Sequence, residues 1–179
     1  MNFVMISIVF FSFAFLLPQI KAECPNDGAG WTLLENTCYL MSQDKMTWYE
    51  AQEFCWGHGG YLAEIKSKWE EDALDQYLLH DLNFWIGLTD QATEGYHDIT
   101  RAMFVWMYVV FLGHWVWAET HGAAEYVNWD INQPDNGEGH DEDCCVKFQK
   151  GQNGWNDLPC DLNNWSVNIH ALCETESEE

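Results

Sequence analysis

The chain has 179 residues and a formal net charge of −22, because 29 Asp and Glu face only seven Lys and Arg. This balance excludes nucleic acid and anionic membrane surfaces as favoured partners, since binding them requires cationic contacts to phosphate groups. The length allows one domain of ordinary size together with a targeting segment. Aromatic residues make up 16% of the chain and include eleven Trp, which predicts a small core with much buried area per residue.

The N-terminal segment has the composition of a secretory signal peptide. Residues 1–17 are almost wholly apolar, Pro18 interrupts the run, and the small Ala22 precedes the first cysteine. The apolar run is short for a membrane-spanning helix, which favours cleavage after Ala22 over an uncleaved membrane anchor. We therefore predict a signal peptide at 1–22 and a secreted, extracellular protein that has no stable membrane span after cleavage.

The cysteines agree with export, because cysteines in an oxidising compartment are usually paired. A zinc site is not favoured, since the chain has no C-x-x-C pair. There are seven, all after Ala22: Cys24, Cys38, Cys55, Cys144, Cys145, Cys160 and Cys173. The odd number leaves one thiol that is free, capped or paired in a disulfide-linked dimer.

The first predicted elements are a strand pair and a helix. Residues 31–42 indicate two strands around a turn at Asn36. Residues 47–56 indicate a helix, because Thr47 can cap it and Glu50 stands three residues later, as in a capping box. Gly59 and Gly60 end this helix.

A strand over 61–65 and a second helix beginning near Ser67 follow, with Glu70 three residues after the capping residue. The expected apolar face of this helix consists of Ala73, Leu74, Tyr77 and Leu78. From Phe84 onward the pattern predicts strands and long loops. Two helices followed by strands indicate an α+β domain.

Short motifs in a fixed order cover nearly the whole chain after residue 22. They are CPNDGAGW at 24–31, CY at 38–39, AQEFC at 51–55, YLAEI at 61–65, WIGLTD at 85–90, QPD at 133–135, WND at 155–157 and LCE at 172–174. Together they resemble the C-type lectin family in its long form. The resemblance implies a C-type lectin-like fold at 23–174, with two helices, antiparallel sheets, disulfides and a long loop region. An acidic tail remains at 175–179.

The resemblance also implies the disulfides Cys24–Cys38 and Cys55–Cys173, with Cys160 paired to either Cys144 or Cys145. Glu142 and Asp143 match the family's calcium-ligand positions only if Cys144 is the bridged cysteine, which favours the pair Cys144–Cys160. If CVKF at 145–148 is instead the family's strand, the bridged cysteine is Cys145.

Residues 133–143 and 156–157 are rich in carboxylate and amide side chains, and Ca²⁺ takes six to eight oxygen ligands of these kinds. An acidic surface loop that binds nothing is the plainer interpretation. The resemblance implies a sugar-linked calcium held by Gln133, Asp135, Glu142, Asn156 and Asp157, which also contact the sugar. A cis peptide bond is expected before Pro134. A second, weaker calcium is implied at Asp90, Glu94, Asn136 and Asp143.

By resemblance, the QPD order implies galactose-type glycans, on microbes or on cell surfaces. The expected aromatic residue after the triplet is replaced by Asn136 and Gly137, which leaves Trp165 or His140 as candidate substitutes. The alternative is a C-type lectin-like domain that binds a protein partner without sugar. Because the sequence contains no HExxH, GxSxG or glycine-rich phosphate loop, we expect no enzyme activity. Asn164 begins NWS, an N-glycosylation acceptor.

Residues 96–113 interrupt the family pattern, since HWVW at 114–117 is expected directly after TEG at 93–95. Ten of these residues, 103–112, are continuously apolar, which is too short to span a bilayer. Three interpretations remain: a loop that touches a membrane or a partner, an extra buried strand, or a translated intron. We expect the segment to be poorly integrated with the domain, because the flanking segments make an uninterrupted family pattern when they are joined.

Overall fold

The computed structural model describes residues 22–26, 28–79, 82–91, 115–137, 141–148, 154–162 and 168–177. Several predictions concern residues outside these ranges: signal-peptide residues 1–21, the insertion at 96–113, Glu94, His140, Asn164 and Trp165. Neither helix in the described part of the chain is long and apolar enough to cross a membrane.

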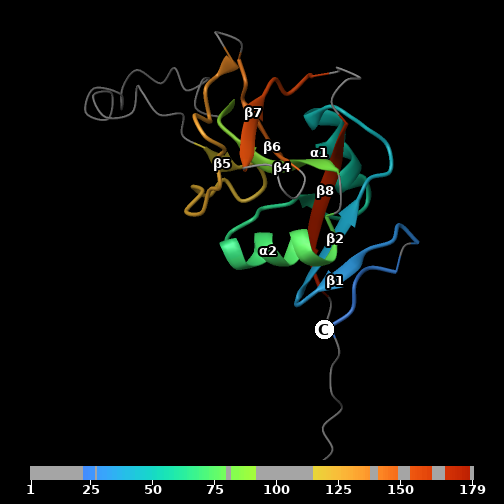
Figure 1. Cartoon of the computed structure of the whole chain (residues 1–179). Coiled ribbons are helices and arrows are strands. Elements are labelled where there is room, and N and C mark those ends of the chain that lie inside the picture. Colours follow the sequence, from blue (N-terminus) through green and yellow to red (C-terminus); the bar gives the residue numbers. More distant parts are fainter. Residues whose placement is uncertain are drawn as a thin grey trace, which may run out of the picture.

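One sheet of eight strands organises the fold, in the order β1-β2-β8-β4-β6-β7, while β3 pairs with β8 and β5 with β4 (Figure 1). The strands are β1 Thr32–Leu34, β2 Thr37–Met41, β3 Tyr61–Leu62, β4 Asn83–Thr89, β5 Val116–Trp117, β6 Cys144–Lys147, β7 Trp155–Leu158 and β8 Ile169–Glu176. The pairs are antiparallel except β4 with β8, which run parallel. The sheet is therefore mixed, where the sequence predicted antiparallel sheets.

The predicted N-terminal strand pair is confirmed, with β1 and β2 on either side of a turn at Glu35 and Asn36. The strand predicted at 61–65 is only Tyr61–Leu62, which pair with Glu174 and Cys173 of β8. At the other end β8 continues through Glu176, which pairs with Thr37. Two residues of the predicted acidic tail therefore belong to the sheet.

The first helix, α1 (Trp48–Gly57), begins as predicted. Thr47 Oγ1 accepts a hydrogen bond from the Glu50 backbone N–H at 3.2 Å, and the Glu50 carboxylate accepts from the Thr47 N–H at 2.8 Å. This reciprocal capping satisfies two backbone donors that the first turn leaves unpaired.

The second helix, α2 (Lys68–Tyr77), is capped by Ser67, whose Oγ accepts from the Glu70 N–H at 3.1 Å. Ala73 and Leu74 are buried as predicted, but Tyr77 is 62% exposed, so its place on the apolar face was wrong. The third buried residue of α2 is the charged Glu71. Helical spacing of apolar residues cannot identify a buried carboxylate, and Glu71 is more deeply buried than Tyr77.

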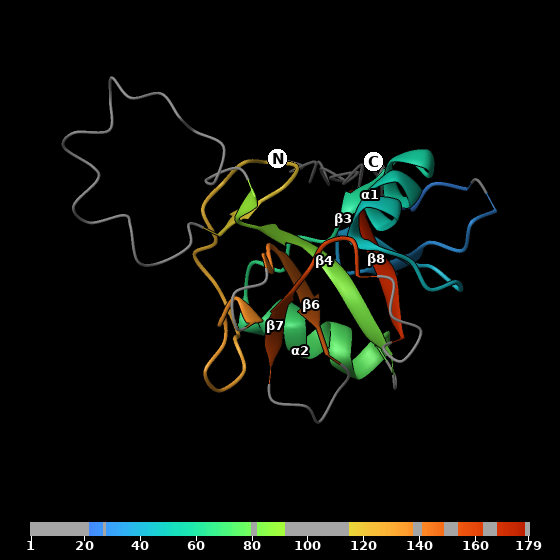
Figure 2. The ribbon, with the colours of Figure 1, turned by 90° about the horizontal axis from the view of Figure 1, so that it is seen from above.

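Two hydrophobic clusters cover the two faces of the sheet, and α1 and α2 lie on opposite sides of β4 and β8 (Figure 2). Because successive side chains of a strand point to opposite faces, β4 divides its residues between them. Phe84, Ile86 and Leu88 join the α2-side cluster, while Trp85 joins the α1-side cluster. Because β4 is buried on both faces, its WIGL segment at 85–88 contains no polar side chain.

Gly87 in β4 marks a close approach of backbones. A Cβ at this position would lie 2.7 Å from the Leu62 carbonyl oxygen, which leaves room for glycine only. The Gly87 N–H donates to the Ala63 carbonyl at 2.8 Å, and its carbonyl accepts from Ala118 at 2.7 Å. Gly87 therefore joins the segment after β3 to the segment after β5.

Three disulfides close the domain: Cys24–Cys38, Cys55–Cys173 and Cys144–Cys160. Strand alternation explains why Cys144 is the bridged member of the adjacent pair. Cys144 faces the α1-side cluster together with Cys160, whereas Cys145 points into the α2-side cluster as a buried free thiol. A thiol buried within one chain is poorly placed for the disulfide-linked dimer considered from the sequence.

Candidate functional site

The loop that carries the QPD triplet is fixed to the start of β7 by backbone hydrogen bonds. The Trp155 N–H donates to the Asn128 carbonyl at 2.7 Å, and the Asp130 N–H donates to the Trp155 carbonyl at 2.8 Å. The Gln133 N–H then donates to the Asp130 carbonyl at 3.0 Å. In Figure 1 this yellow-to-orange segment runs beside β7. The loop and the WND motif therefore form one unit.

Asp157 connects β7 to the triplet itself. Its carboxylate is buried, at 1% exposure, and accepts the backbone N–H of Asp135 at 3.2 Å and that of Asn136 at 2.8 Å. The peptide bond between Gln133 and Pro134 is cis, as expected. Asp157 therefore fixes the chain on the far side of Pro134 while presenting carboxylate oxygens at the loop.

Three carboxylates converge at this place. Asp135, Glu142 and Asp157 each offer an oxygen atom, and these oxygens all lie within 4.8 Å of one another. Glu142 is held by its backbone N–H, which donates to Asn136 Oδ1 at 2.8 Å. A side chain at position 137 would collide with the Glu142 carboxylate, so Gly137 makes room for that ligand candidate.

Two amide side chains that stand close to these carboxylates in the sequence have an oxygen without a hydrogen-bond partner among the described residues. The two oxygens are Gln133 Oε1 and Asn156 Oδ1, and both atoms are buried. A buried polar oxygen without a partner costs free energy, so such atoms normally face a ligand, an ion or a water molecule. Three carboxylates with two amide oxygens are a donor set that suits a hard cation such as Ca²⁺. The residues present therefore fit the metal that the sequence suggested.

The second predicted ligand set is partly described. The Asp90 N–H donates to the Asp143 carbonyl at 3.2 Å, and Thr89 Oγ1 donates to the same carbonyl at 2.6 Å, so the end of β4 lies against the start of β6. Asn136 Oδ1 is already the acceptor for Glu142. Glu94 lies outside the described residues.

A buried polar cluster that the sequence did not reveal lies between α2 and the strands β6 and β7. Lys147 Nζ lies 2.8 Å from Asp75 Oδ1 and 3.2 Å from Glu71 Oε1. Glu71 also accepts the Trp155 indole N–H at 2.8 Å and the Tyr126 hydroxyl at 2.6 Å. Two features of the sequence could have indicated this cluster. Glu71 stands three residues before Leu74, on the buried face of the helix, and Lys147 stands between the apolar Val146 and Phe148.

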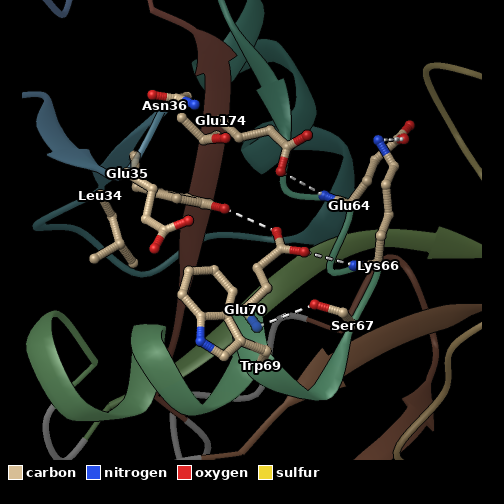
Figure 3. Close-up of a pocket in the computed structure, with 11 residues that line it drawn as sticks. Leu34, Glu35, Asn36, Glu64, Lys66, Ser67, Trp69, Glu70 and Glu174 are labelled. Carbon is tan, nitrogen blue, oxygen red and sulfur yellow. Dashed lines mark hydrogen bonds and ion pairs between the residues drawn. The ribbon is translucent and has the colours of Figure 1, made fainter. Parts of the chain in front are cut away.

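A second acidic group lies at the other end of the molecule, in a pocket of about 240 Å³ between the β1–β2 turn, α2 and β8. Figure 3 shows Glu35, Glu70 and Glu174 directed toward this space, with Trp69 beside it. Glu70 accepts the Tyr39 hydroxyl and the Lys66 backbone N–H, each at 2.8 Å. Partners from the chain itself occupy its carboxylate.

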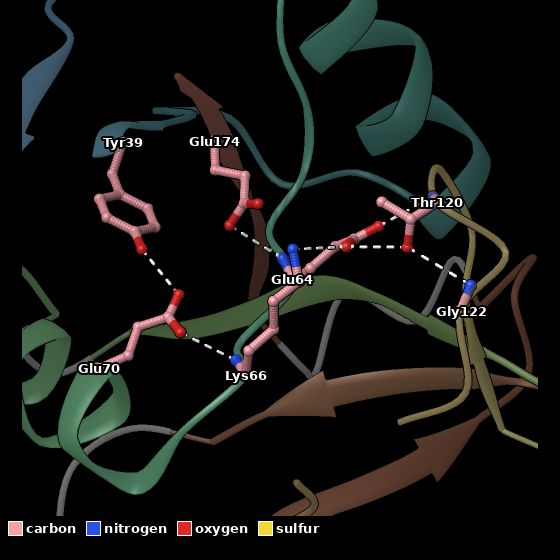
Figure 4. Close-up of polar contacts among 7 residues, drawn as sticks. All are labelled: Tyr39, Glu64, Lys66, Glu70, Thr120, Gly122 and Glu174. Atoms are coloured by element: carbon pink, nitrogen blue, oxygen red, sulfur yellow. Dashed lines mark hydrogen bonds and ion pairs between the residues drawn. The ribbon is translucent and has the colours of Figure 1, made fainter. Parts of the chain in front are cut away.

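Glu64 joins this pocket to the loop after β5, as Figure 4 shows. Its carboxylate accepts the Thr120 N–H and the Thr120 hydroxyl, each at 3.0 Å, and lies 2.9 Å from Lys66 Nζ. The Glu64 N–H donates to Glu174 Oε2 at 3.0 Å. The carboxylates of Glu64, Glu70 and Glu174 therefore stabilise the fold by accepting hydrogen bonds from other segments of the chain.

Burial is the largest cause of the raised pKa of two groups, the Glu174 carboxyl and the Cys145 thiol. Desolvation raises the pKa of Glu174 to about 7, and the nearby Glu70 carboxylate acts in the same direction. Burial likewise raises the pKa of the Cys145 thiol, assisted by the negative charges of Asp157 and Glu71. The Cys145 thiol therefore stays protonated and unreactive at neutral pH.

Comparison with known proteins agrees with this geometry. The family described as Lectin C-type domain matches residues 44–174. The chain is 28% identical to a perlucin-like protein of Mytilus galloprovincialis over 155 residues, which are 83% of this chain and 86% of that protein. It is 31% identical to asialoglycoprotein receptor 2 of Mus musculus over 148 residues, 79% of this chain but only 40% of that receptor.

Among solved structures, the chain resembles the carbohydrate-recognition domain of the mouse scavenger receptor C-type lectin, with a TM-score of 0.63 and 29% identity. The match covers 87% of this chain and 98% of that domain. The family match, the mixed sheet with two helices and the three disulfides lead to one conclusion: the chain belongs to the C-type lectin domain family.

Proposed function

We propose that this chain is a calcium-dependent lectin that binds galactose-type glycans. The observation that carries the proposal is the grouping of three carboxylates, each with an oxygen within 4.8 Å of the others. Gln133 and Asn156 stand within two residues of Asp135 and Asp157 in the chain, and each adds a buried amide oxygen that lacks a partner among the described residues. The ligands would be Gln133, Asp135, Glu142, Asn156 and Asp157. When bound, Ca²⁺ supplies a positive centre at which two adjacent sugar hydroxyls complete the oxygen shell.

The side chains have complementary tasks around the sugar. An amide can present its oxygen to a cation and its NH₂ to a sugar oxygen, while a carboxylate accepts a hydrogen bond from a sugar hydroxyl. Asp157 is pre-organised for this task, because the Asp135 and Asn136 N–H groups fix both of its oxygens. Fixed hydrogen-bonding groups reduce the ordering cost of binding a small polar ligand.

The order of Gln133 and Asp135 around Pro134 supports galactose-type specificity. An amide before the proline and a carboxylate after it fix which side of the site donates and which side accepts hydrogen bonds, and this decides which pair of vicinal hydroxyls fits. Asialoglycoprotein receptor 2, one of the similar proteins, is by name a receptor for asialoglycoproteins. That ligand class is defined by its carbohydrate and agrees with the proposal.

We further propose that the chain is secreted after cleavage behind Ala22 and acts outside the cell on glycans of microbes or of cell surfaces. The apolar run at 1–17 and the three disulfides support this compartment. N-terminal sequencing of protein secreted from eukaryotic cells should begin at Glu23.

Retention on immobilised sugars tests the proposed function. The full chain should bind galactose beads in calcium and elute with EDTA, and should bind mannose beads more weakly. The double variant Gln133→Glu with Asp135→Asn reverses amide and carboxylate and should reverse the preference. Exposed Asp161→Asn serves as the matched control and should behave like the unsubstituted chain. Retention that ignores EDTA, or no retention on either sugar, contradicts the proposal.

A further inference from the structure

The buried polar cluster beneath β7 has a defined centre in Glu71. Its side chain is 5% exposed, and both carboxylate oxygens are occupied. Oε1 accepts the Trp155 indole N–H at 2.8 Å and lies 3.2 Å from Lys147 Nζ, while Oε2 accepts the Tyr126 hydroxyl at 2.6 Å. One carboxylate of α2 therefore holds three side chains from β6, β7 and the loop before the QPD triplet.

A buried charged group of this kind is costly unless it is fully paired. Lys147 and Glu71 are both buried, so neither charged side chain is solvated. An apolar residue at position 71 would extend the cluster around Leu74 without that cost. A pure packing role therefore does not explain why a carboxylate stands here, whereas three directed hydrogen-bonding contacts do.

The geometry of β7 connects this cluster to the proposed ligands. Trp155 and Asp157 are two residues apart in one strand, so both side chains point to the same face. Opposite them in β6 stand Lys147, paired with Trp155, and Cys145, paired with Asp157. Glu71 thus contacts one cross-strand pair, and the next pair on the same face contains a ligand candidate.

The backbone of Trp155 carries the connection to the other ligands. Its N–H donates a hydrogen bond to the Asn128 carbonyl, and its carbonyl accepts one from the Asp130 N–H. The Asp130 carbonyl in turn accepts a hydrogen bond from the Gln133 N–H. Its ring stands edge-on to Tyr126 and Trp129, with centroids 5.7 and 6.1 Å away. Asn156 follows directly in the chain. A shift of the Trp155 indole therefore displaces β7 and the triplet loop together.

We propose that Glu71 is a positioning residue for the calcium and sugar site, acting through Trp155 and Tyr126. This inference rests on the proposed function. Glu71 touches neither ion nor sugar, and it fixes the strand and loop that present the oxygens. Groups that orient metal ligands typically change metal affinity about 10–100-fold when they are substituted.

The test compares two neighbouring glutamates of α2 in the full chain. Glu71→Gln keeps the size of the side chain but cannot accept from Trp155, Tyr126 and Lys147 together. Glu70→Gln is the matched control, because Glu70 accepts two hydrogen bonds from Tyr39 and Lys66 in the pocket of Figures 3 and 4. The affinity for Ca²⁺ alone is measured by calorimetry, well below each unfolding midpoint, and each midpoint is measured without calcium.

Both substitutions should lower the calcium-free midpoint, but only Glu71→Gln should weaken calcium binding, by roughly ten-fold. A dissociation constant unchanged in Glu71→Gln, or weakened equally in Glu70→Gln, overturns the inference. If Glu71→Gln fails to fold, Tyr126→Phe removes a single donor and should weaken calcium binding about five-fold, the factor that corresponds to the net contribution of one hydrogen bond. An unchanged affinity in that variant overturns the inference as well.

The result also separates this inference from the proposed function. Absence of calcium binding by the unsubstituted chain overturns both. Calcium binding by the unsubstituted chain that Glu71→Gln leaves intact overturns the positioning role alone.

Discussion

Asn136 donates its backbone N–H to Oδ2 of Asp157 at 2.8 Å, across 21 residues of sequence. The neighbouring Asp135 N–H donates to the other oxygen of the same carboxylate. Asp157 is therefore a part of the loop's internal structure as well as a ligand candidate. Its substitution has two separable consequences, one for folding and one for binding.

Substituting Asp157 should remove binding and cost some stability. Asp157→Asn keeps the shape, but its NH₂ then faces one of the two backbone N–H groups. Asp135 and Asn136 are exposed, so the freed N–H can bind water, and the cost is at most the contribution of one hydrogen bond to a charged group, about 1.5–3 kcal/mol. Calcium affinity should fall more than about ten-fold, since substituting a group that merely orients a ligand already costs that much.

Calorimetry with Ca²⁺ and urea unfolding without it measure the two effects of Asp157→Asn separately. Exposed Asp161→Asn again provides the control with the same chemistry. An Asp157→Asn protein that binds calcium as tightly as the unsubstituted chain would remove Asp157 from the ligand set.

Calcium should stabilise the fold by mass action. Extracellular modules bind calcium with dissociation constants of about 10⁻⁴–10⁻³ M, so about 10 mM calcium contributes roughly 1.4–2.7 kcal/mol. The unfolding midpoint should rise by several degrees for a domain of this size. Differential scanning calorimetry measures this, with equal magnesium as the control, because Mg²⁺ dehydrates reluctantly. Equal shifts with both ions would indicate a salt effect instead of a site.

Local sequence patterns were enough to predict much of the fold. The Thr47 capping box and the turn at Asn36 rest on contacts between near neighbours, and both occur in the structure. The cis bond before Pro134 and the three disulfides came from family resemblance. Only the strand register showed which cysteine is bridged, because alternation sends Cys144 and Cys145 to opposite faces.

Contacts between distant residues outside the family motifs could not be predicted from the sequence. The Glu71 carboxylate meets the Trp155 indole across 84 residues, and neither residue type indicates the other. Tyr77 was placed on the buried face by helical spacing, yet α2 buries Glu71 in preference. For the calcium ligands, residue chemistry suggested the set, while the convergence of Asp135, Glu142 and Asp157 needed coordinates.

Glu174 should make stability depend on pH in a distinctive direction. Its pKa is raised to about 7 in the folded state, against about 4.3 in an unfolded chain. The folded state then holds an extra proton between these values, so its contribution to stability is complete below about pH 4.3 and is lost as the pH rises through about 7. The groups facing it are Glu64, Glu70, Lys66 and Tyr61.

Glu174→Gln should remove this contribution, on the order of 3 kcal/mol between pH 4.5 and 7.5, while an amide oxygen still accepts the Glu64 N–H. Urea unfolding at a series of pH values gives the difference between the two proteins. Exposed Glu53→Gln controls for the loss of one negative charge. Parallel pH curves for the unsubstituted chain and Glu174→Gln would show that Glu174 ionises normally.

Deleting residues 96–113 should leave a folded domain that still binds galactose. Thr89 at the end of β4 pairs with Val116 at the start of β5, so a connection must link adjacent strand ends. After deletion, six residues from 90–95 and two from 114–115 remain, and these eight can close an antiparallel hairpin. Removing the apolar run should also raise solubility.

Gel filtration and galactose retention of the deletion variant test this. A variant that aggregates or loses sugar binding would show that 96–113 is a structural element of the domain. Sequencing of spliced transcripts separately decides the intron interpretation, which fails if every transcript retains these codons.

Sugar binding by this chain should require calcium. The decisive measurement is a calorimetric titration of galactose into the full chain, once in about 10 mM calcium and once in EDTA, because calcium at this level exceeds the dissociation constants expected of an extracellular site. We predict saturable binding of galactose in calcium and none in EDTA, with mannose binding more weakly. Equal heats of galactose binding with and without calcium, or no binding in calcium, would show that this chain is not a calcium-dependent galactose-binding lectin.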